Sequence, residues 1–294
     1  MSTGIGITTI LDCLKSGEPL MGVNPSGWWG TDDSHEDQKM FIARQLGWRK
    51  GLDSFGGTLR SFAHNQYGPV AAKAAEWKMR VQIPSNLPAG GVYMISQYRE
   101  LMDWLYKGTR VDKLFPYPTA WLKMGVSFFM HRYSAEPVIS IATDSKTKDV
   151  VYVTRWTEPL SGLGILRQIE KLEENMVFSS REYDGLQVPC VLSDIDVDLS
   201  WILGMKNNSW FISWAKQKIL FGMNEKGFAV QEDTGMYAMK SNIARVKPKP
   251  YVVSPDRESF LFWRRRPGVD FPLSMYQLTV GDFKDPGDLN AIVS

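Results

Sequence analysis

The sequence lacks the features that mark several protein classes. Its 294 residues include only two cysteines, Cys13 and Cys190, which excludes a disulfide framework and the paired thiols of a zinc site. The densest apolar run, residues 124–130, is far shorter than the ~20 residues of a membrane-spanning helix. The first residues lack the basic and long apolar regions of a secretory signal. We therefore expect a protein of the virion or cytoplasm that is not secreted by a signal peptide and has no membrane partner.

A strong charge of either sign is also absent. Lys and Arg number 34 and Asp and Glu number 32, so the formal net charge is only +2. Attraction of the whole chain to nucleic acid is excluded, and any such binding needs a local patch. Charged residues make up 22% and hydrophobic residues 44%, a balance typical of a globular protein.

No recognisable catalytic or cofactor motif is present. Residues 4–6 begin like a dinucleotide fingerprint, but Thr9 stands at the third glycine position and no strand precedes the motif. His35, His64 and His131 lie far apart in sequence and outside metal or nucleophile motifs, so structural or surface roles are favoured. Their convergence in space stays open. The sequence thus predicts no catalytic residue, no metal, no cofactor and no enzyme activity.

Asp194, Asp196 and Asp198 stand at alternate positions, so in a strand all three project to one face. Oxygen ligands suit hard cations such as Mg²⁺ or Ca²⁺, and a metal-dependent enzyme with a site assembled in space is one alternative. A solvated sheet face with Ile195 and Val197 turned inward is the favoured interpretation.

Helical patterns predominate in the first part of the chain. Apolar spacing predicts helices over residues 36–50, 69–81 and 95–107, with Asp32, Asp33 and Ser34 as candidate caps of the first. Leu114 to Pro118 breaks the pattern. We therefore divide the chain into a mainly helical region, 1–115, and a β-rich region, 116–294, with one continuous domain as an alternative.

Strand signals dominate the second region. Residues 138–143 and 150–153 flank a polar turn and predict a hairpin, and an amphipathic helix is expected over 161–176. Further strands are expected at 188–199, 218–223, 228–231, 251–254, 259–264 and 273–280, with a turn at 224–227. The predicted class is α+β, with a helix-rich N-terminal part followed by a mostly antiparallel or mixed sheet and at least one packed helix.

Three short segments follow the order of elements around the reactive loop of serpins. Gln217-Lys218-Ile219, then Asn224-Glu225-Lys226-Gly227, and later Phe260-Leu261-Phe262 resemble that region. Residues 228–234 lack the small-residue hinge that an inhibitory serpin needs for loop insertion, and the chain is short for that fold. No site residue is carried over from this resemblance, and the predicted function rests on composition.

Residues 240–266 form a basic segment, with eight Lys or Arg against two acidic residues. Aromatic residues interleave with the cations, a composition that can combine phosphate neutralisation with base stacking. Nucleic-acid binding is therefore an alternative function, although a sheet core with cations that contact acidic neighbours is favoured. The candidate contacts are Arg245, Lys247, Lys249, Arg264, Arg265 and Arg266.

The sequence is rich in aromatic residues, with 11 Trp, 11 Tyr and 14 Phe. Such residues are enriched in protein interfaces. With no catalytic motif, they favour a non-enzymatic structural subunit of a virus or bacteriophage particle, such as a capsid, tail or baseplate protein. Its partners would be copies of itself and other particle subunits. The candidate interface residues are Trp28, Trp29, Tyr117 and Trp121.

Overall fold

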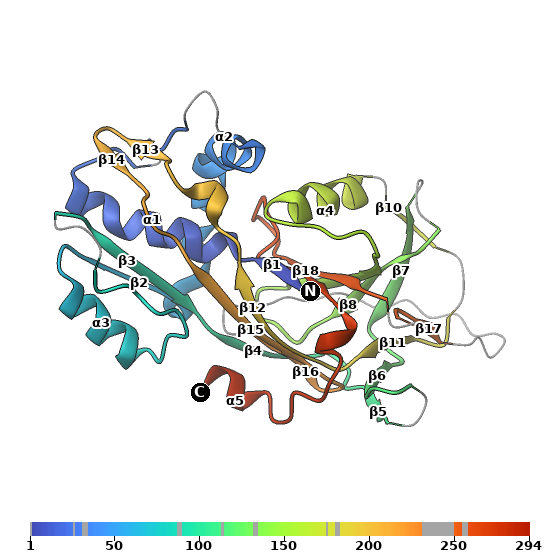
Figure 1. Ribbon diagram of the computed structural model, residues 1–294. Helices are drawn as coiled ribbons and strands as arrows, with labels where there is room; N and C mark the ends of the chain where they lie inside the picture. Colours follow the sequence, from blue (N-terminus) through green and yellow to red (C-terminus); the bar gives the residue numbers. More distant parts are fainter. Residues whose placement is uncertain are drawn as a thin grey trace.

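The structure is a computed structural model that describes residues 2–25, 27–30, 35–86, 90–112, 115–131, 135–174, 176–179, 183–230, 250–254 and 258–294. Within these ranges the chain is a mixed α+β protein in which strands dominate and five α-helices cover the sheets (Figure 1). None of the helices in the described ranges is long and apolar enough to cross a membrane.

The largest sheet has seven strands, and each neighbouring pair is antiparallel. Its order is β1 (Thr3–Ile5), β19 (Ser274–Leu278), β18 (Phe260–Arg265), β9 (Val150–Arg155), β8 (Val138–Ala142), β7 (Val126–His131) and β10 (Met176–Phe178). The predicted hairpin is confirmed as β8 and β9. The helix α4 (Gly164–Glu174) lies beside this sheet, as Figure 1 shows, and confirms the helix expected over 161–176.

The other β structure of the described residues consists of two four-stranded sheets and two strand pairs. One sheet has the order β17 (Tyr251–Val252), β11 (Leu186–Pro189), β6 (Thr119–Leu122) and β5 (Thr109–Val111). The other has the order β12 (Val191–Val197), β15 (Gln217–Met223), β16 (Gly227–Val230) and β4 (Glu100–Asp103). The pairs are β2 (Leu59–His64) with β3 (Tyr93–Tyr98), and β13 (Lys206–Asn207) with β14 (Trp210–Phe211).

Alternate residues of the pair β2–β3 face opposite sides, and each side packs against a helix. On one side Ile95 packs with Val70 and Ala74 of α3 (Tyr67–Glu76). On the other side lies α1 (Ile7–Met21), where Gly17 leaves no room for a Cβ because Met94 Sδ lies 2.2 Å from that position. The helix α1 was not predicted.

The remaining helical segments are short except for α2 (Glu36–Lys50), which confirms the predicted helix. The N-cap of α2 is His35, whose Nδ1 accepts a hydrogen bond from the Asp37 amide. The predicted caps at residues 32–34 lie outside the described residues. The others are α5 (Asn290–Val293) and the 3-10 helices η1 (Leu52–Thr58), η2 (Ser200–Ile202) and η3 (Val280–Asp282).

The α+β class is confirmed, but a helix-rich N-terminal part is not, because β1 to β5 lie within the first 115 residues. The predicted helix 95–107 is wrong, since residues 93–103 form β3 and β4. Its helix-like apolar spacing is overridden by backbone pairing, of β3 with β2 and of β4 with β16. The division at residue 115 stays a prediction.

Candidate functional site

The candidate site is a split between two long strands. β4 continues β3 along the chain after Arg99, and β16 is inserted between β4 and β15 in antiparallel register with both (Figure 1). Past Val230, however, β16 no longer separates the strands. There β3 pairs with β2 and β15 pairs with β12, but β3 and β15 do not pair with each other in the described ranges. We call this gap between Tyr93–Tyr98 and Gln217–Leu220 the slot.

A cavity of about 420 Å³ occupies the slot. Its floor is the α1 face with Thr9, Ile10, Cys13 and Leu14, and its walls are β3 and residues 209–218. The two backbone edges have no strand between them among the described residues, and with the apolar walls they make the slot a surface that a further strand or an apolar molecule can fill.

Phe228 fixes β16 at the upper end of the slot. Its side chain is only 1% exposed, and its ring centroid lies 5.4 Å from that of Trp104, 5.5 Å from Phe262 and 6.3 Å from Phe221. The guanidinium carbon of Arg264 lies 5.4 Å from the same ring. The side chain of Phe228 therefore anchors the start of β16 in the hydrophobic core.

The turn before β16 is held by Trp104. The Trp104 indole N–H donates to the Asn224 carbonyl (2.9 Å), and the Trp104 amide donates to the Lys226 carbonyl (2.9 Å). Gly227 passes so close to β4 that a Cβ would lie 2.0 Å from the Met102 carbonyl oxygen. On the outer face, Ala229 is covered by Leu289 and by Ile292 of α5. Both faces of β16 are thus buried.

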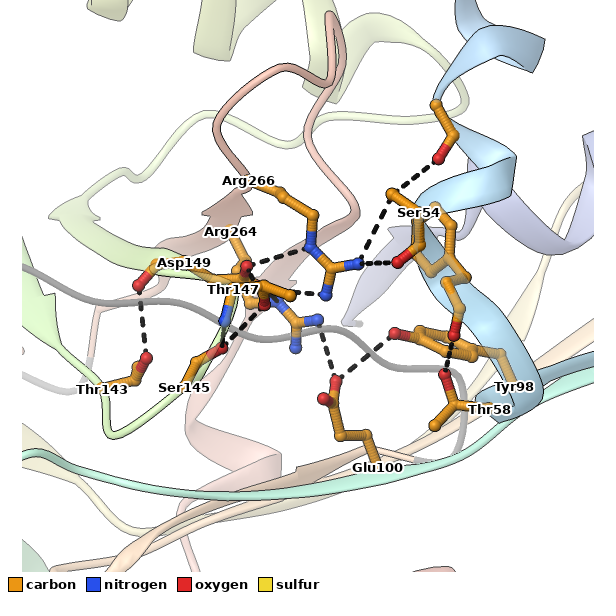
Figure 2. A network of polar contacts seen from close by, with 12 residues as sticks. Ser54, Thr58, Tyr98, Glu100, Thr143, Ser145, Thr147, Asp149, Arg264 and Arg266 are labelled. Atoms are coloured by element: carbon orange, nitrogen blue, oxygen red, sulfur yellow. Dashed lines mark hydrogen bonds and ion pairs between the residues drawn. The ribbon is translucent and has the colours of Figure 1, made fainter.

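A buried ionic network lies beneath this point (Figure 2). Arg266 donates through Nε and Nη2 to Asp149, at 3.0 and 3.1 Å, and Arg264 Nη2 donates to Glu100 Oε2 at 3.2 Å. Arg264 and Asp149 have no exposed side-chain surface. Among the described residues, Arg264 Nε and Nη1 have no hydrogen-bond partner, and Nε lies 3.8 Å from Asp149 Oδ2. Burial raises the pKa of the Glu100 carboxyl, and the positive charge of Arg264 opposes that rise.

The network also ties segments together that are distant in sequence. Arg266 Nη1 also donates to the Ser54 carbonyl of η1 at 3.1 Å, and Tyr98 of β3 donates to Glu100 at 3.4 Å. The Thr147 hydroxyl also donates to Asp149 Oδ1 at 2.7 Å, so the Asp149 carboxylate accepts hydrogen bonds from both Thr147 and Arg266.

The predicted basic contacts that the structure describes are paired with acidic side chains of this chain. Arg264 and Arg266 are buried as described, and Arg265 Nε donates to Glu173 Oε1 at 2.8 Å. All three guanidinium groups thus pair with carboxylates of the same chain, and their contact with nucleic acid or an acidic partner stays a prediction. Arg245, Lys247 and Lys249 lie outside the described residues.

The four predicted interface aromatics differ in exposure. Trp28 is 2% exposed and donates to Glu18 Oε1 at 2.9 Å, and Tyr117 is 6% exposed and donates to the Ser254 carbonyl. These two rings are core residues of this chain. Trp29 is 48% exposed, and the Trp121 indole donates to the Asp184 carbonyl at 3.1 Å. Their role in an interface stays a prediction.

The three aspartates of β12 and its end form the solvated face that was favoured. Asp194, Asp196 and Asp198 are exposed, whereas Ile195 and Val197 are buried. Asp194 pairs with Arg80, and Asp196 pairs with Lys216 and Lys218. Across the described part of the chain, no group of His, Cys, Asp or Glu is arranged to hold a metal ion.

The histidines do not converge. His35 caps α2, the Nδ1 of His64 accepts from the Gln66 amide at 3.0 Å, and the Nε2 of His131 lies 2.9 Å from the Lys171 carbonyl oxygen. Sequence reasoning missed the slot itself, although it predicted the strands 218–223 and 228–231 and the turn that joins them. The signal available in the sequence was the succession of these two strands and the turn between them.

Comparison with solved structures gives the fold. The chain aligns with a cleaved, loop-inserted form of ovalbumin over 94% of its own length and 93% of that chain, with a TM-score of 0.56 and 10% identity. The fold is serpin-like. Native protease nexin-1 with heparin aligns over 95% and 92%, with a TM-score of 0.56 and 13% identity. SRPN18 from Anopheles gambiae aligns over 98% and 94%, with a TM-score of 0.53 and 11% identity.

No family model and no curated protein sequence matches this chain. The serpin-like architecture extends over nearly the whole chain and is not confined to residues 217–262. The prediction of a virion structural subunit that assembles with copies of itself is wrong, because the solved structures with this fold are serpins and not particle components. Half of the aromatic residues, such as Phe228 and Trp104, are buried in this chain's own core, so their abundance alone does not indicate an interface.

Proposed function

We propose that this protein is a non-catalytic inhibitor of proteases. It offers residues 231–249 for cleavage and takes up the released segment as a new strand in the slot, even though residues 228–234 lack the small-residue hinge of an inhibitory serpin. The observation that carries this proposal is β16, which is inserted between β15 and β4 and whose last described residue, Val230, lies where the slot begins. Residues 231–249 continue directly from that end.

The register of β16 defines where such a strand would lie. Val230 is opposite Glu100 and Phe221, so a strand that continues in the same register would run between β3 and residues 217–220 of β15. It would form backbone hydrogen bonds with both free edges, which is the general mode of strand addition. β3 is six residues long, which gives a slot of about 20 Å.

Two named structures support the proposal by analogy. The ovalbumin structure is described as cleaved and loop-inserted, and protease nexin-1 carries its relation to proteases in its name. Cleavage matters physically because it frees one end of the segment from its connection to Pro250, and so removes a constraint on its entry into the sheet.

The test is limited proteolysis followed by thermal unfolding. Residues 231–249 contain Lys240, Arg245, Lys247 and Lys249, so a trypsin-like protease is a suitable probe. We expect the cleaved halves to stay associated and the melting temperature to rise by roughly 10 °C, which corresponds to a few kcal/mol in a chain of this size. The same protease should lose activity in proportion to the protein added.

A synthetic peptide with the sequence of residues 231–240 provides the matched reagent, with a scrambled peptide as control. Binding of the native peptide should raise the melting temperature of the intact chain, while the scrambled one should not. A cleaved chain that melts at or below the temperature of the intact chain, with full protease activity, would refute strand uptake and inhibition together.

A further inference from the structure

We propose that the cavity in the slot of the intact chain binds a small amphiphile with a single anionic head group and an apolar body of acyl-chain type. Only the consequence of that binding, competition with strand uptake, rests on the function proposed above. The binding itself rests on the walls and the rim of the cavity.

The walls favour an apolar body. Ile10 and Leu14 line the floor, and Ile95 and Ile212 line the two sides; each of these residues is buried from solvent. Trp214 lines the cavity beside them. The volume of about 420 Å³ lies within the range of about 300–1,000 Å³ that small-molecule sites occupy.

The rim favours an anionic head. The charged residues that line the cavity, among those described, are Arg80, Lys216 and Lys218, and no Asp or Glu lines it. Asp194 and Asp196 pair with these cations from β12, so three positive charges share two carboxylates. The Lys216 side chain is 43% exposed. One excess positive charge at a partly solvated mouth matches a carboxylate better than a neutral or cationic group.

A cysteine that lines the cavity allows binding in the cavity to be measured. Cys13 is a free, half-buried thiol on the floor, whereas Cys190 is fully buried elsewhere. A molecule that fills the cavity therefore shields Cys13 from a thiol reagent. Alkylation by N-ethylmaleimide at about pH 9, where some thiolate forms, measures occupancy without any assay of protease inhibition.

The probes are dodecanoate and dodecanol, used below their micellar concentrations. We expect dodecanoate at about ten times its dissociation constant to slow alkylation of Cys13 roughly tenfold, with dodecanol weaker. The double variant K216Q/K218Q should bind dodecanoate about two- to fivefold more weakly and dodecanol unchanged. K146Q, in the exposed turn after β8, is the matched control and should behave like the wild type.

Unchanged alkylation of Cys13 at the highest soluble dodecanoate concentration would overturn the site. Equal protection by dodecanol, with no effect of K216Q/K218Q, would overturn the anionic head group. After cleavage within 231–249, the inserted strand should itself protect Cys13 and abolish dodecanoate binding. Dodecanoate that binds intact and cleaved chains equally would refute strand uptake and leave the amphiphile site standing, so the two failures are distinguishable.

Discussion

Replacing Phe228 by Ala tests whether β16 is a built part of the core. The side chain is 1% exposed and lies among three aromatic rings with centroids 5.4 to 6.3 Å away. Removing a buried Phe ring typically costs about 3–5 kcal/mol, from lost transfer free energy and the cavity left behind. Lost aromatic pairing with Trp104 places this site in the upper half of that range.

The assay is urea unfolding followed by tryptophan fluorescence, with F211A as control. Phe211 is 62% exposed, so its removal should change the free energy of unfolding by less than about 0.5 kcal/mol. F228A should also increase the rate of protease cleavage near Val230, because β16 then leaves the sheet more often. A loss below about 1 kcal/mol for F228A, with unchanged cleavage, would refute the anchoring role.

Three further outcomes are expected. Asp149→Asn should lower the free energy of unfolding in urea by about 3–5 kcal/mol, because it leaves the buried Arg266 guanidinium without its carboxylate, whereas Arg264 keeps Glu100; Asp53→Asn, at a side chain 82% exposed, is the control and should have little effect. Burial raises the pKa of the Cys13 thiol to about 12, so its alkylation should be slow at neutral pH and rise about tenfold per pH unit toward that pKa, while Cys190 stays unlabelled; a plateau near pH 9 would contradict this. Glu232→Ala should enlarge the rise in melting temperature that follows cleavage. If the β16 register continues, residue 232 faces inward like Phe228, where an unpaired carboxylate is costly. An equal or smaller rise would contradict this register.

Local patterns predicted the elements whose partners are near in sequence. The hairpin β8–β9 and the helices α2 and α4 follow from periodicity and turn residues alone. Residues 95–107 were mistaken for a helix because their conformation depends on strands distant in sequence: residues 95–98 pair with β2, and residues 100–103 pair with β16, more than 120 residues later. Spacing alone cannot detect such a partner.

The candidate site depended even more on distant contacts. The basic character of Arg264, Arg265 and Arg266 is plain in the sequence, but the carboxylates that neutralise them come from Glu100, Asp149 and Glu173. Charge counted in a local window therefore overstated what solvent or a nucleic acid could meet. The cavity combines α1, β3 and residues 209–218, three segments that no single motif joins.

Gly227 has a consequence for how a strand can occupy the sheet. A slip by two residues keeps the same faces inward and outward, and would otherwise be the easiest error of pairing. At this position, however, the slip would bring Glu225 or Ala229 to the place where the Met102 carbonyl leaves no space for a Cβ. The inserted strand can therefore pair in a single register, which is fixed by the absence of a Cβ at residue 227.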